Sequence, residues 1–353
     1  MSDAEAKQEH PGGNKMDRRT LIAAAPLLAL SGLARAQTPA PAAPRAPPAP
    51  ITFPPPTLAS TVAAEGLHFP EAPVVMKDGS VLFVQIEAKQ VSRLKPDGMV
   101  SLVAQLDGGP NGLAIGPDKA LYVANDGGRF SFVKRGEFNF PGAAPPDFVG
   151  GSIQRVDLKT GKAVTLYDSC DGKRLVAPDD LVFDRHGGMW VSDLGHIRGD
   201  AGIYYALPDG KGIKQVKGGM NGPNGIGLSP DGKQLHISEG RQLLTFDIAG
   251  PGVLGPSTSY PGAVHAPLRD RSTADSLKVL ADGKVAVCTL IVGGISIIDP
   301  AGATEFIQFA DPMTTNLALG GADMRDAWIT SSGLGRILKV RWPYPGMKPV
   351  YTA

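Results

Sequence analysis

Residues 222–240 read GPNGIGLSPDGKQLHISEG, and residues 109–127 read GPNGLAIGPDKALYVANDG, so one segment occurs twice with few changes. Each copy holds an Asn-Gly pair, a short apolar run, a turn built on Pro-Asp and a second apolar run. Short apolar runs separated by Gly, Pro and Asp turns are typical of β-hairpins. The two copies therefore predict a domain in which one hairpin-based unit is repeated.

Similar strand pairs follow one another along most of the chain. Apolar runs such as SVLFVQI, GMWVSDL, KVAVCTL and DAWITSS each follow a turn rich in Gly or Asp, and six units of about 40–50 residues fit between about residue 65 and residue 350. This period is that of four-stranded propeller blades. The sequence therefore predicts an all-β fold, a six-bladed β-propeller over residues 59–353. A β-sandwich, the alternative, would explain the turns but not the repeat.

One interval in the repeat is longer than the others. Residues 127–150, GGRFSFVKRGEFNFPGAAPPDFVG, are rich in Gly, Pro and Phe and separate two of the units. They predict a loop over one face of the propeller, where Phe130 and Phe132 are candidates to cover a pocket.

The composition excludes some classes of function. The 353 residues include 35 Lys and Arg against 34 Asp and Glu, a net charge of +1, and the body of the chain has no basic cluster. A nucleic-acid-binding surface needs such a cluster, so no nucleic-acid partner is expected. Cys170 lies in a polar turn and Cys288 in an apolar run. A disulfide between them is therefore not favoured, and no cysteine-based metal site is expected.

The first 58 residues have the pattern of an export signal and a spacer. Arg18 and Arg19 precede an apolar run, and Ala36 ends a small-residue cleavage site. This layout resembles a twin-arginine (Tat) signal over residues 1–36. An uncleaved membrane anchor is the alternative, and Met16 is an alternative start. Residues 37–58 are rich in Pro and Ala and predict an extended linker.

The signal also predicts where the mature chain works. A twin-arginine signal implies the Tat export machinery as a partner and a periplasmic or secreted location in a bacterium. Its apolar run is too short to cross a bilayer comfortably, so no stable membrane span is expected after cleavage.

One polar residue stands at the head of each unit's first strand. In a propeller the first strand of every blade lines the central axis, so equivalent positions in successive blades converge at one end of the channel. The six residues are Glu71, Asn111, Asp179, Asn224, Asp275 and Asn316. The repeat thus predicts a ring of side-chain oxygens.

Carboxylates and carboxamides are hard oxygen ligands. They make Ca²⁺ the expected cation, with Mg²⁺, Mn²⁺ or Zn²⁺ as alternatives, and Zn²⁺ is less favoured because no His or Cys joins the ring. A cation would also relieve the repulsion between converging carboxylates. Simpler explanations stay open, since Asn111 and Asn224 could only start Asn-Gly turns, and Asp179 and Asp275 could cap local backbone.

The chain resembles a known group over roughly residues 65–345. Residues 70–86 (PEAPVVMKDGSVLFVQI), 178–195 (PDDLVFDRHGGMWVSDLG), 222–240 and 274–289 (ADSLKVLADGKVAVCT) are similar in order and spacing to the senescence marker protein/gluconolactonase/luciferin-regenerating family. This family consists of six-bladed propellers with one divalent metal at the mouth of the channel. The resemblance implies that Glu71, Asn224 and Asp275 are metal ligands, with Ser276 as a further candidate, and that Asp275 is the catalytic acid/base.

The chain departs from the family pattern at two places. Asp179 stands where the family usually has an Asn that touches metal or substrate, so Asp179 is expected to be a further metal ligand that adds a negative charge, or to replace a neutral substrate contact. Ala177 stands where the animal sugar-lactonase branch has an Arg, which puts specificity for sugar-acid lactones in question.

The resemblance implies a metal-dependent lactonase or esterase that hydrolyses a small lactone or ester. The cation would polarise the carbonyl, and a water would attack it. Asn111, His196 and Asn316 are candidate substrate contacts. The alternatives are a non-catalytic propeller that binds a ligand or a protein around a structural metal, or phosphotriesterase or lyase chemistry at the same site.

Overall fold

The computed structural model describes residues 53–353 apart from 197–198, 256–262 and 270. The export signal predicted for residues 1–36 and most of the linker predicted for residues 37–58 lie outside these ranges. The described residues form β-strands and no helix, so they hold no helical segment able to cross a membrane.

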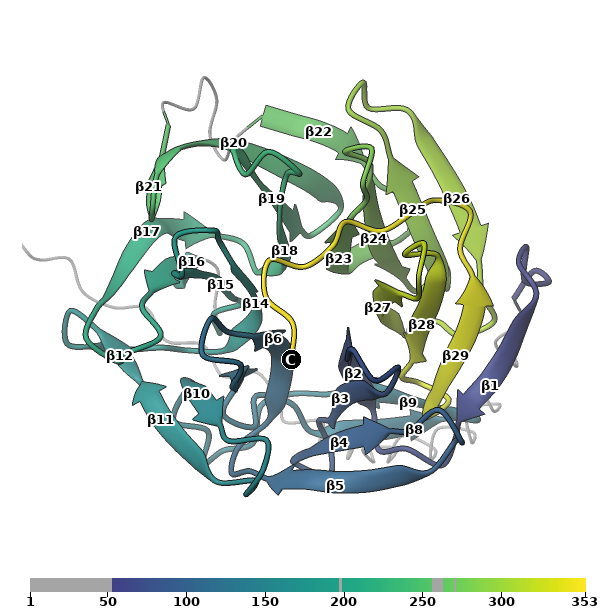
Figure 1. Ribbon diagram of the computed structural model, residues 1–353, viewed down its shortest axis with the longest axis horizontal. Helices are drawn as coiled ribbons and strands as arrows, with labels where there is room; N and C mark the ends of the chain where they lie inside the picture. Colours follow the sequence, from purple (N-terminus) through teal and green to yellow (C-terminus); the bar gives the residue numbers. More distant parts are fainter. Residues whose placement is uncertain (1–52, 197–198, 256–262, 270) are drawn as a thin grey trace, which may run out of the picture. The chain divides into compact units, whose positions relative to one another are not determined.

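Six antiparallel sheets surround a central channel, as the repeat predicts (Figure 1). Blade 1 comprises β2 (Pro70–Val75), β3 (Val81–Gln85), β4 (Gln90–Leu94) and β5 (Val100–Gln105). Blade 2 comprises β6 (Pro110–Ile115), β7 (Leu121–Asn125), β10 (Ser152–Val156) and β11 (Ala163–Tyr167). Blade 3 comprises β14 (Pro178–Phe183), β15 (Met189–Asp193), β16 (Ala201–Ala206) and β17 (Ile213–Met220).

The second half of the chain forms the other three blades. Blade 4 comprises β18 (Pro223–Leu228), β19 (Gln234–Glu239) and β20 (Gln242–Gly250), which pairs with both β21 (Val253–Leu254) and β22 (Ala263–Pro267). Blade 5 comprises β23 (Thr273–Val279), β24 (Val285–Leu290), β25 (Gly294–Ile298) and β26 (Thr304–Gln308). Blade 6 comprises β27 (Thr314–Gly320), β28 (Asp326–Ser331), β29 (Arg336–Arg341) and β1 (Ser60–Ala64).

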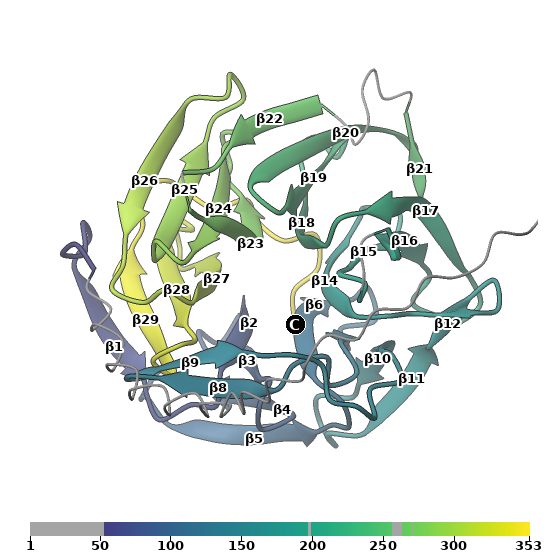
Figure 2. The same cartoon turned by 180° about the vertical axis from the view of Figure 1, so that it is seen from behind.

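Blade 6 is completed from the opposite end of the chain. β1 pairs antiparallel with β29, with Ser60 opposite Val340 and Val62 opposite Leu338. The strand pattern of the sequence does not show this pairing, because β1 is an isolated strand without a hairpin partner next to it. The pairing joins the first and last parts of the domain in one sheet and leaves β1 as the outer edge of the blade (Figure 2).

The core lies between neighbouring blades. All five residues of each of the strands β3, β7 and β15 are buried, because each of these strands is covered on both faces by adjacent sheets. Leu82 and Val84 of blade 1 share one apolar cluster with Leu113 and Val123 of blade 2. This packing explains why the second strand of most units reads as a continuous apolar run instead of an alternating one.

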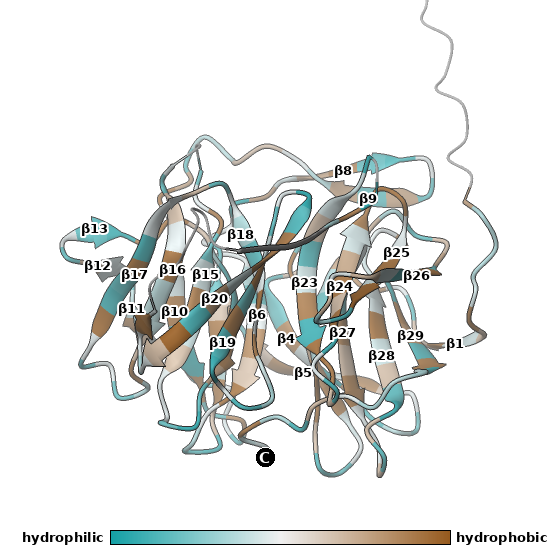
Figure 3. Ribbon diagram, turned by 90° about the horizontal axis from the view of Figure 1, so that it is seen from above, coloured by the Kyte–Doolittle hydropathy of each residue, from teal (hydrophilic) through white to brown (hydrophobic). Residues whose placement is uncertain are grey.

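Two further hairpins leave the blades. β8 (Phe132–Arg135) and β9 (Phe138–Pro141) pair within the long insertion, and β12 (Ser169–Cys170) pairs with β13 (Lys173–Arg174). The insertion predicted as a loop therefore contains a hairpin of its own. It lies at one end of the channel, whereas the C-terminal segment lies across the other end (Figure 3).

Candidate metal centre

The six inner strands bring the six repeated polar residues to the same end of the channel. Each inner strand contacts the inner strand of the next blade, and β27 contacts β2 to close the circle. Glu71, Asn111, Asp179 and Asn224 are the second residues of their strands, and Asp275 and Asn316 are the third. Phe69, just before β2, packs on Phe132 of β8 with ring centroids 5.0 Å apart, so the ring lies at the end that carries the β8–β9 hairpin.

A β-bulge occurs in every inner strand beside these residues. The regular pairing with the second strand shifts between Glu71 and Val74 in β2 and at the matching place in the five other blades. A bulge turns a strand and re-aims its side chains. The polar side chains are thereby directed by the backbone of each blade.

The Asn-Gly pairs are not turns. Asn111 and Asn224 lie within β6 and β18. A Cβ atom on Gly112 would lie 2.5 Å from the Asp179 carbonyl oxygen and 2.6 Å from the Asp180 Cα. A Cβ atom on Gly225 would lie 2.5 Å from the Leu277 backbone nitrogen. Glycine is thus needed because the next blade approaches closely, and the turn interpretation of these two pairs is wrong.

Two of the asparagines hold two of the carboxylates. The side-chain nitrogen of Asn111 donates to Asp179 Oδ1 at 2.6 Å, and that of Asn316 donates to Glu71 Oε2 at 2.6 Å. Asn316 Oδ1 also accepts the Leu317 N–H at 2.8 Å, so both ends of this amide are engaged within the protein. Asn111 and Asn316, the candidate substrate contacts, therefore orient ring carboxylates in this structure.

Asn224 is placed differently from the other asparagines. Its Oδ1 is buried and has no hydrogen-bond partner, although Asn224 as a whole is only partly buried. Asp275, on the adjacent inner strand, is also partly exposed, whereas Glu71 and Asp179 are buried, at 4% and 3% exposure. The accessible part of the ring is thus the Asn224–Asp275 side, where an amide oxygen is available to a ligand.

Asp180 is a fourth carboxylate at this site, which the sequence pattern did not single out. It is buried, its Oδ1 accepts the Leu181 N–H at 2.9 Å, and its Oδ2 has no hydrogen-bond partner. Neighbouring side chains in a strand normally point to opposite faces, so the pattern favours Asp179 alone. The bulge between Pro178 and Leu181 interrupts this alternation. Two consecutive aspartates at the start of an otherwise apolar strand were the feature of the sequence that could have identified Asp180.

Burial and mutual repulsion shift the titration of these groups. Burial is the main cause that raises the pKa of Glu71 to about 7 and the pKa values of Asp179 and Asp275 well above the usual range. The Asp275 carboxylate adds to the rise at Asp179, and the Glu71 carboxylate adds to the rise at Asp275. The Asn224 side chain, as a hydrogen-bond donor, opposes the rise in the pKa of Asp275. The carboxylates therefore resist being charged together.

These properties fit a hard divalent cation. Within the described residues no three His, Cys, Asp or Glu side chains are grouped so that they alone could hold a metal ion. Any cation at the ring would therefore need an amide oxygen, and Asn224 Oδ1 is the buried oxygen that lacks a partner. A positive charge would also favour the ionised forms of Glu71 and Asp275. The donor set suits Ca²⁺ or Mg²⁺ better than Zn²⁺.

The remaining candidates lie around this ring. The buried Ser276 follows Asp275 in β23. His196 is exposed, and its ring lies 5.9 Å from that of Phe148 in the insertion. His196 and Phe148 line a pocket of about 430 Å³ that contains none of the ring residues. His196 thus lines a separate pocket and is not among the residues that the structure brings together in the ring.

Asp126, at the end of β7, is a further buried acid near the ring. Its Oδ1 accepts the N–H groups of Gly128 at 2.7 Å and Arg129 at 3.0 Å, and its Oδ2 has no partner. Burial raises its pKa to about 7. These bonds fix the start of the insertion that carries β8 and β9, so Asp126 has a structural role at this end of the channel.

The two cysteines, Cys170 and Cys288, are buried and form no disulfide with each other.

Comparisons with known proteins agree with this architecture. The family model described as SMP-30/Gluconolactonase/LRE-like region matches residues 69–333. The chain belongs to this family. The match begins two residues before Glu71 and ends beyond Asn316, so it includes all six ring residues.

Individual relatives are more distant. The gluconolactonase of Zymomonas mobilis is 27% identical over 202 residues, 50% of this chain and 50% of that protein, so the chain spans about half of the relative's length. The structure of a gluconolactonase from Xanthomonas campestris superposes with a TM-score of 0.66 at 19% identity, covering 85% of this chain and 100% of that chain. A calcium-binding regucalcin from Agrobacterium tumefaciens superposes with a TM-score of 0.64 at 16% identity, covering 82% and 98%. These structures share the fold.

Proposed function

We propose that the polar ring is the active site of a divalent-cation-dependent lactonase. The carrying observation is the unpartnered, buried Oδ1 of Asn224 beside the partly exposed Asp275, within a group of carboxylates that burial keeps from ionising together. The support from relatives is that the Zymomonas mobilis and Xanthomonas campestris proteins are named gluconolactonases, and that the Agrobacterium tumefaciens protein is named as calcium-binding.

The protein's own residues divide the task. Glu71, Asn224 and Asp275 would hold the cation, with Asp179 and Ser276 next to them. When bound, a divalent cation supplies Lewis-acid polarisation of the lactone carbonyl and stabilises negative charge on its oxygen. Asn316 and Asn111 keep Glu71 and Asp179 in place by donating to their oxygens.

Asp275 is the residue proposed to move protons. Its carboxylate lies on the accessible side of the polar ring and a bound cation would keep it ionised, so it would accept a proton from the water that attacks the carbonyl carbon. Asp275 then returns the proton to the endocyclic oxygen of the lactone as the bond between that oxygen and the carbonyl carbon breaks. The product is an open-chain hydroxy acid.

We propose that the substrate is a lactone that carries fewer hydroxyl groups than a sugar lactone. Ala177, which stands where the sugar-lactonase branch has an Arg, is fully buried, and its N–H donates to Asp193 Oδ1 at 2.7 Å. No cationic side chain is therefore available at this position to bind a polyhydroxylated substrate.

The test is a substrate panel on purified protein. Gluconolactone, aliphatic γ- and δ-lactones and aryl esters are offered with Ca²⁺, Mg²⁺, Mn²⁺ or Zn²⁺, and again after treatment with a chelator. We expect lactone hydrolysis that the chelator abolishes and one cation restores. Glu71→Gln should lose this activity, whereas Glu65→Gln, an exposed blade-6 acid paired with Arg336 at 3.6 Å, should keep it.

Two results would redirect the proposal. Stoichiometric cation binding by calorimetry without hydrolysis of any lactone would favour a non-catalytic binding propeller. Hydrolysis of a phosphotriester, or elimination from a non-lactone substrate, would place a different reaction on the same ring.

We also propose that the protein is exported by the Tat pathway and works in the periplasm. The support is the Arg18-Arg19 pair followed by an apolar run and a small-residue cleavage site. Replacing both arginines with lysine should leave the precursor in the cytoplasmic fraction, whereas the unchanged chain should appear in the periplasmic fraction, cleaved before Gln37.

A further inference from the structure

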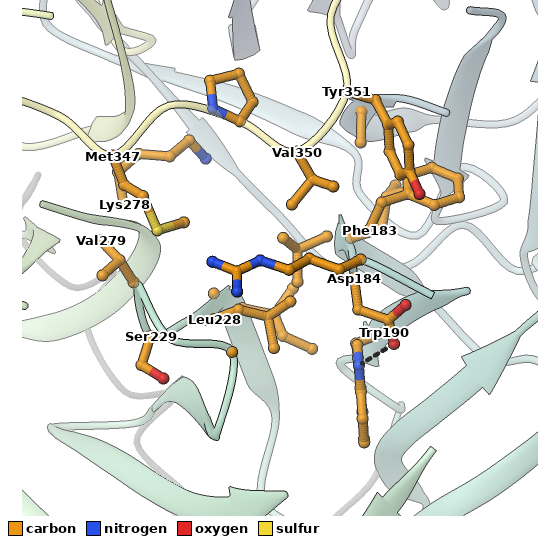
Figure 4. A pocket seen from close by; sticks show the side chains of 18 of the residues that line it. Phe183, Asp184, Trp190, Leu228, Ser229, Lys278, Val279, Met347, Val350 and Tyr351 are labelled. Carbon is orange, nitrogen blue, oxygen red and sulfur yellow. Dashed lines mark hydrogen bonds between the residues drawn. The ribbon is translucent and has the colours of Figure 1, made fainter. Parts of the chain in front are cut away.

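A second cavity lies at the end of the channel opposite to the polar ring. It has a volume of about 720 Å³ and is lined by the C-terminal halves of the inner strands, including Leu113, Ala114 and Ile226. Leu228 and Val279 are among the lining side chains that Figure 4 labels. The ring residues stand at the other ends of these strands, and none of them lines this cavity. Its volume is within the range of sites for small organic molecules.

The chain's own C-terminal segment forms the wall that closes this cavity. Met347, Val350 and Tyr351 line it, and the ring of Tyr351 packs edge-on against Phe183 with centroids 5.9 Å apart. The Met347 N–H donates to the Val279 carbonyl at 3.2 Å, and the Ala353 carbonyl accepts the Lys77 N–H at 3.3 Å. The segment is thus fixed at both ends around a mostly apolar space.

The cavity carries an excess of positive charge. Lys278 lies within it, half-buried, and the exposed Arg185, Lys233 and Lys348 stand at its edge. Within the described residues none of these four cations lies within 4.0 Å of a carboxylate, and Arg185 donates only to the Pro230 carbonyl, at 2.6 Å. Lys278 is near enough to the buried Asp180 to oppose the rise that burial causes in the pKa of that carboxyl, so its charge is shared with this acid, but like the other three it has no carboxylate among the described residues within ion-pair distance that would occupy it.

The two acids that line the cavity are already engaged. Asp184 accepts the N–H of His186 at 2.8 Å and the hydroxyl of Tyr205 at 2.9 Å, and the indole N–H of Trp190 at 3.3 Å (Figure 4). Asp231 accepts the hydroxyl of Ser229 at 2.7 Å. These bonds come from neutral donors and leave both carboxylates charged, so the lining holds four basic side chains against two acids, an excess of positive charge.

We propose that this cavity binds a small amphipathic anion, with one carboxylate or sulfonate and an aromatic or medium-chain aliphatic body. The apolar strand ends would bury the body, and Lys278 with Arg185 would hold the charged group. A cationic ligand is disfavoured here and would be attracted to the carboxylates at the other end of the channel. The site is independent of the proposed lactonase activity.

The probe for the test is 8-anilinonaphthalene-1-sulfonate, an aromatic monoanion. Trp190 lines the cavity, so bound probe should accept energy transfer from it. We expect saturable binding to one site and displacement by decanoate. Decanol should displace the probe at least tenfold less well, and decyltrimethylammonium should not displace it.

Variants locate the binding. Lys278→Met should weaken probe binding at least tenfold, and Arg185→Gln a few-fold. Ala114→Phe should abolish binding by filling the cavity. Lys95→Gln, an exposed lysine in the β4–β5 turn that does not line the cavity, is the matched control and should change nothing. Thermal melts verify that each variant is folded. If Lys278→Met is unstable, Arg185→Gln still tests the proposal, because the exposed Arg185 side chain can be replaced without disturbing the fold.

The proposal is overturned by any of three results. One is that the folded variants Arg185→Gln and Ala114→Phe bind the probe with the same affinity as the unsubstituted protein. Another is equal displacement by decanoate and decyltrimethylammonium. The third is loss of probe binding in Glu71→Gln with retention in Ala114→Phe, which would place the probe at the ring. Lactonase activity is not a readout here, so its absence would not affect the result.

Discussion

The two ends of the channel are built from the same six strands but have opposite character. At the starts of these strands, bulges aim acids and amides into a ring of buried oxygens. At their ends, regular pairing resumes, the residues that line the cavity are mostly apolar, and basic side chains outnumber acids. The comparison shows that a propeller can place two unlike sites on one set of strands because each strand supplies a different residue to each end.

The two ends also differ in how charge is tolerated. The ring withdraws its carboxylates from water, completely for Glu71 and Asp179 and partly for Asp275, and this raises the pKa values of all three. The cavity keeps three of its four cations exposed to water at its edge. A bound cation would therefore stabilise the ionised form of the acidic end, whereas the exposed cations of the basic end are already solvated by water.

The largest effect is expected at the acidic end. Asp275→Asn keeps an oxygen ligand but removes the proposed base, so turnover should fall about 10³-fold, within the range for a general acid/base. Lactone hydrolysis at saturating cation measures this loss, and calorimetry verifies that the cation still binds. Near-normal turnover with bound cation would remove Asp275 as the base.

The next effect concerns the close approach of the inner strands. Gly112→Ala places a methyl group against the backbone of Asp179 and Asp180, so the free energy of unfolding should fall by about 2–4 kcal/mol. Gly250→Ala is the matched control, since no atom lies within 4 Å of the added carbon. Urea unfolding of both variants measures the difference, and equal stability of the two would contradict the role assigned to Gly112.

A smaller effect is expected when a carboxylate loses its orienting partner. Asn316→Ala removes the donor to Glu71 Oε2, so cation affinity should fall about 10–100-fold while the variant remains folded. Asn139→Ala, a partly exposed asparagine whose side chain donates to Glu87 at 3.0 Å, is the control. Titration calorimetry measures both, and unchanged affinity in Asn316→Ala would show that Glu71 needs no such support.

The smallest effect is the pH dependence of the metal-free protein. The folded pKa of Glu71, about 7, exceeds the ordinary 4.5, so its contribution to stability is present below about pH 4.5 and is lost as the pH rises through 7. The melting temperature should therefore fall by a few degrees between pH 5 and pH 8. Added Ca²⁺ should reduce this fall, and Glu71→Gln should flatten part of it. A melting temperature that rises over this range would contradict the assignment.

Sequence reasoning reached the acidic end but not the basic one. The repeat identified the six ring positions because each blade contributes one residue at a fixed place in its unit. Asp180 was missed because alternation in a regular strand directs it away from Asp179, and only the bulge buries both. The cavity was missed because its wall is a C-terminal segment outside the repeat, and its cations come from a strand, two turns and that segment, without a common spacing.

The pairing of β1 with β29 has consequences for the folding of incomplete chains and for circular permutation. β1 pairs with β29 near the other end of the domain, so the circle cannot close until almost the whole chain is available. A product that stops before residue 336 lacks β29, the strand that receives β1, so β28 keeps an open edge and β1 has no partner. Because the two ends of the domain share one sheet, a circular permutant with new termini in a connection between blades should fold to the same propeller.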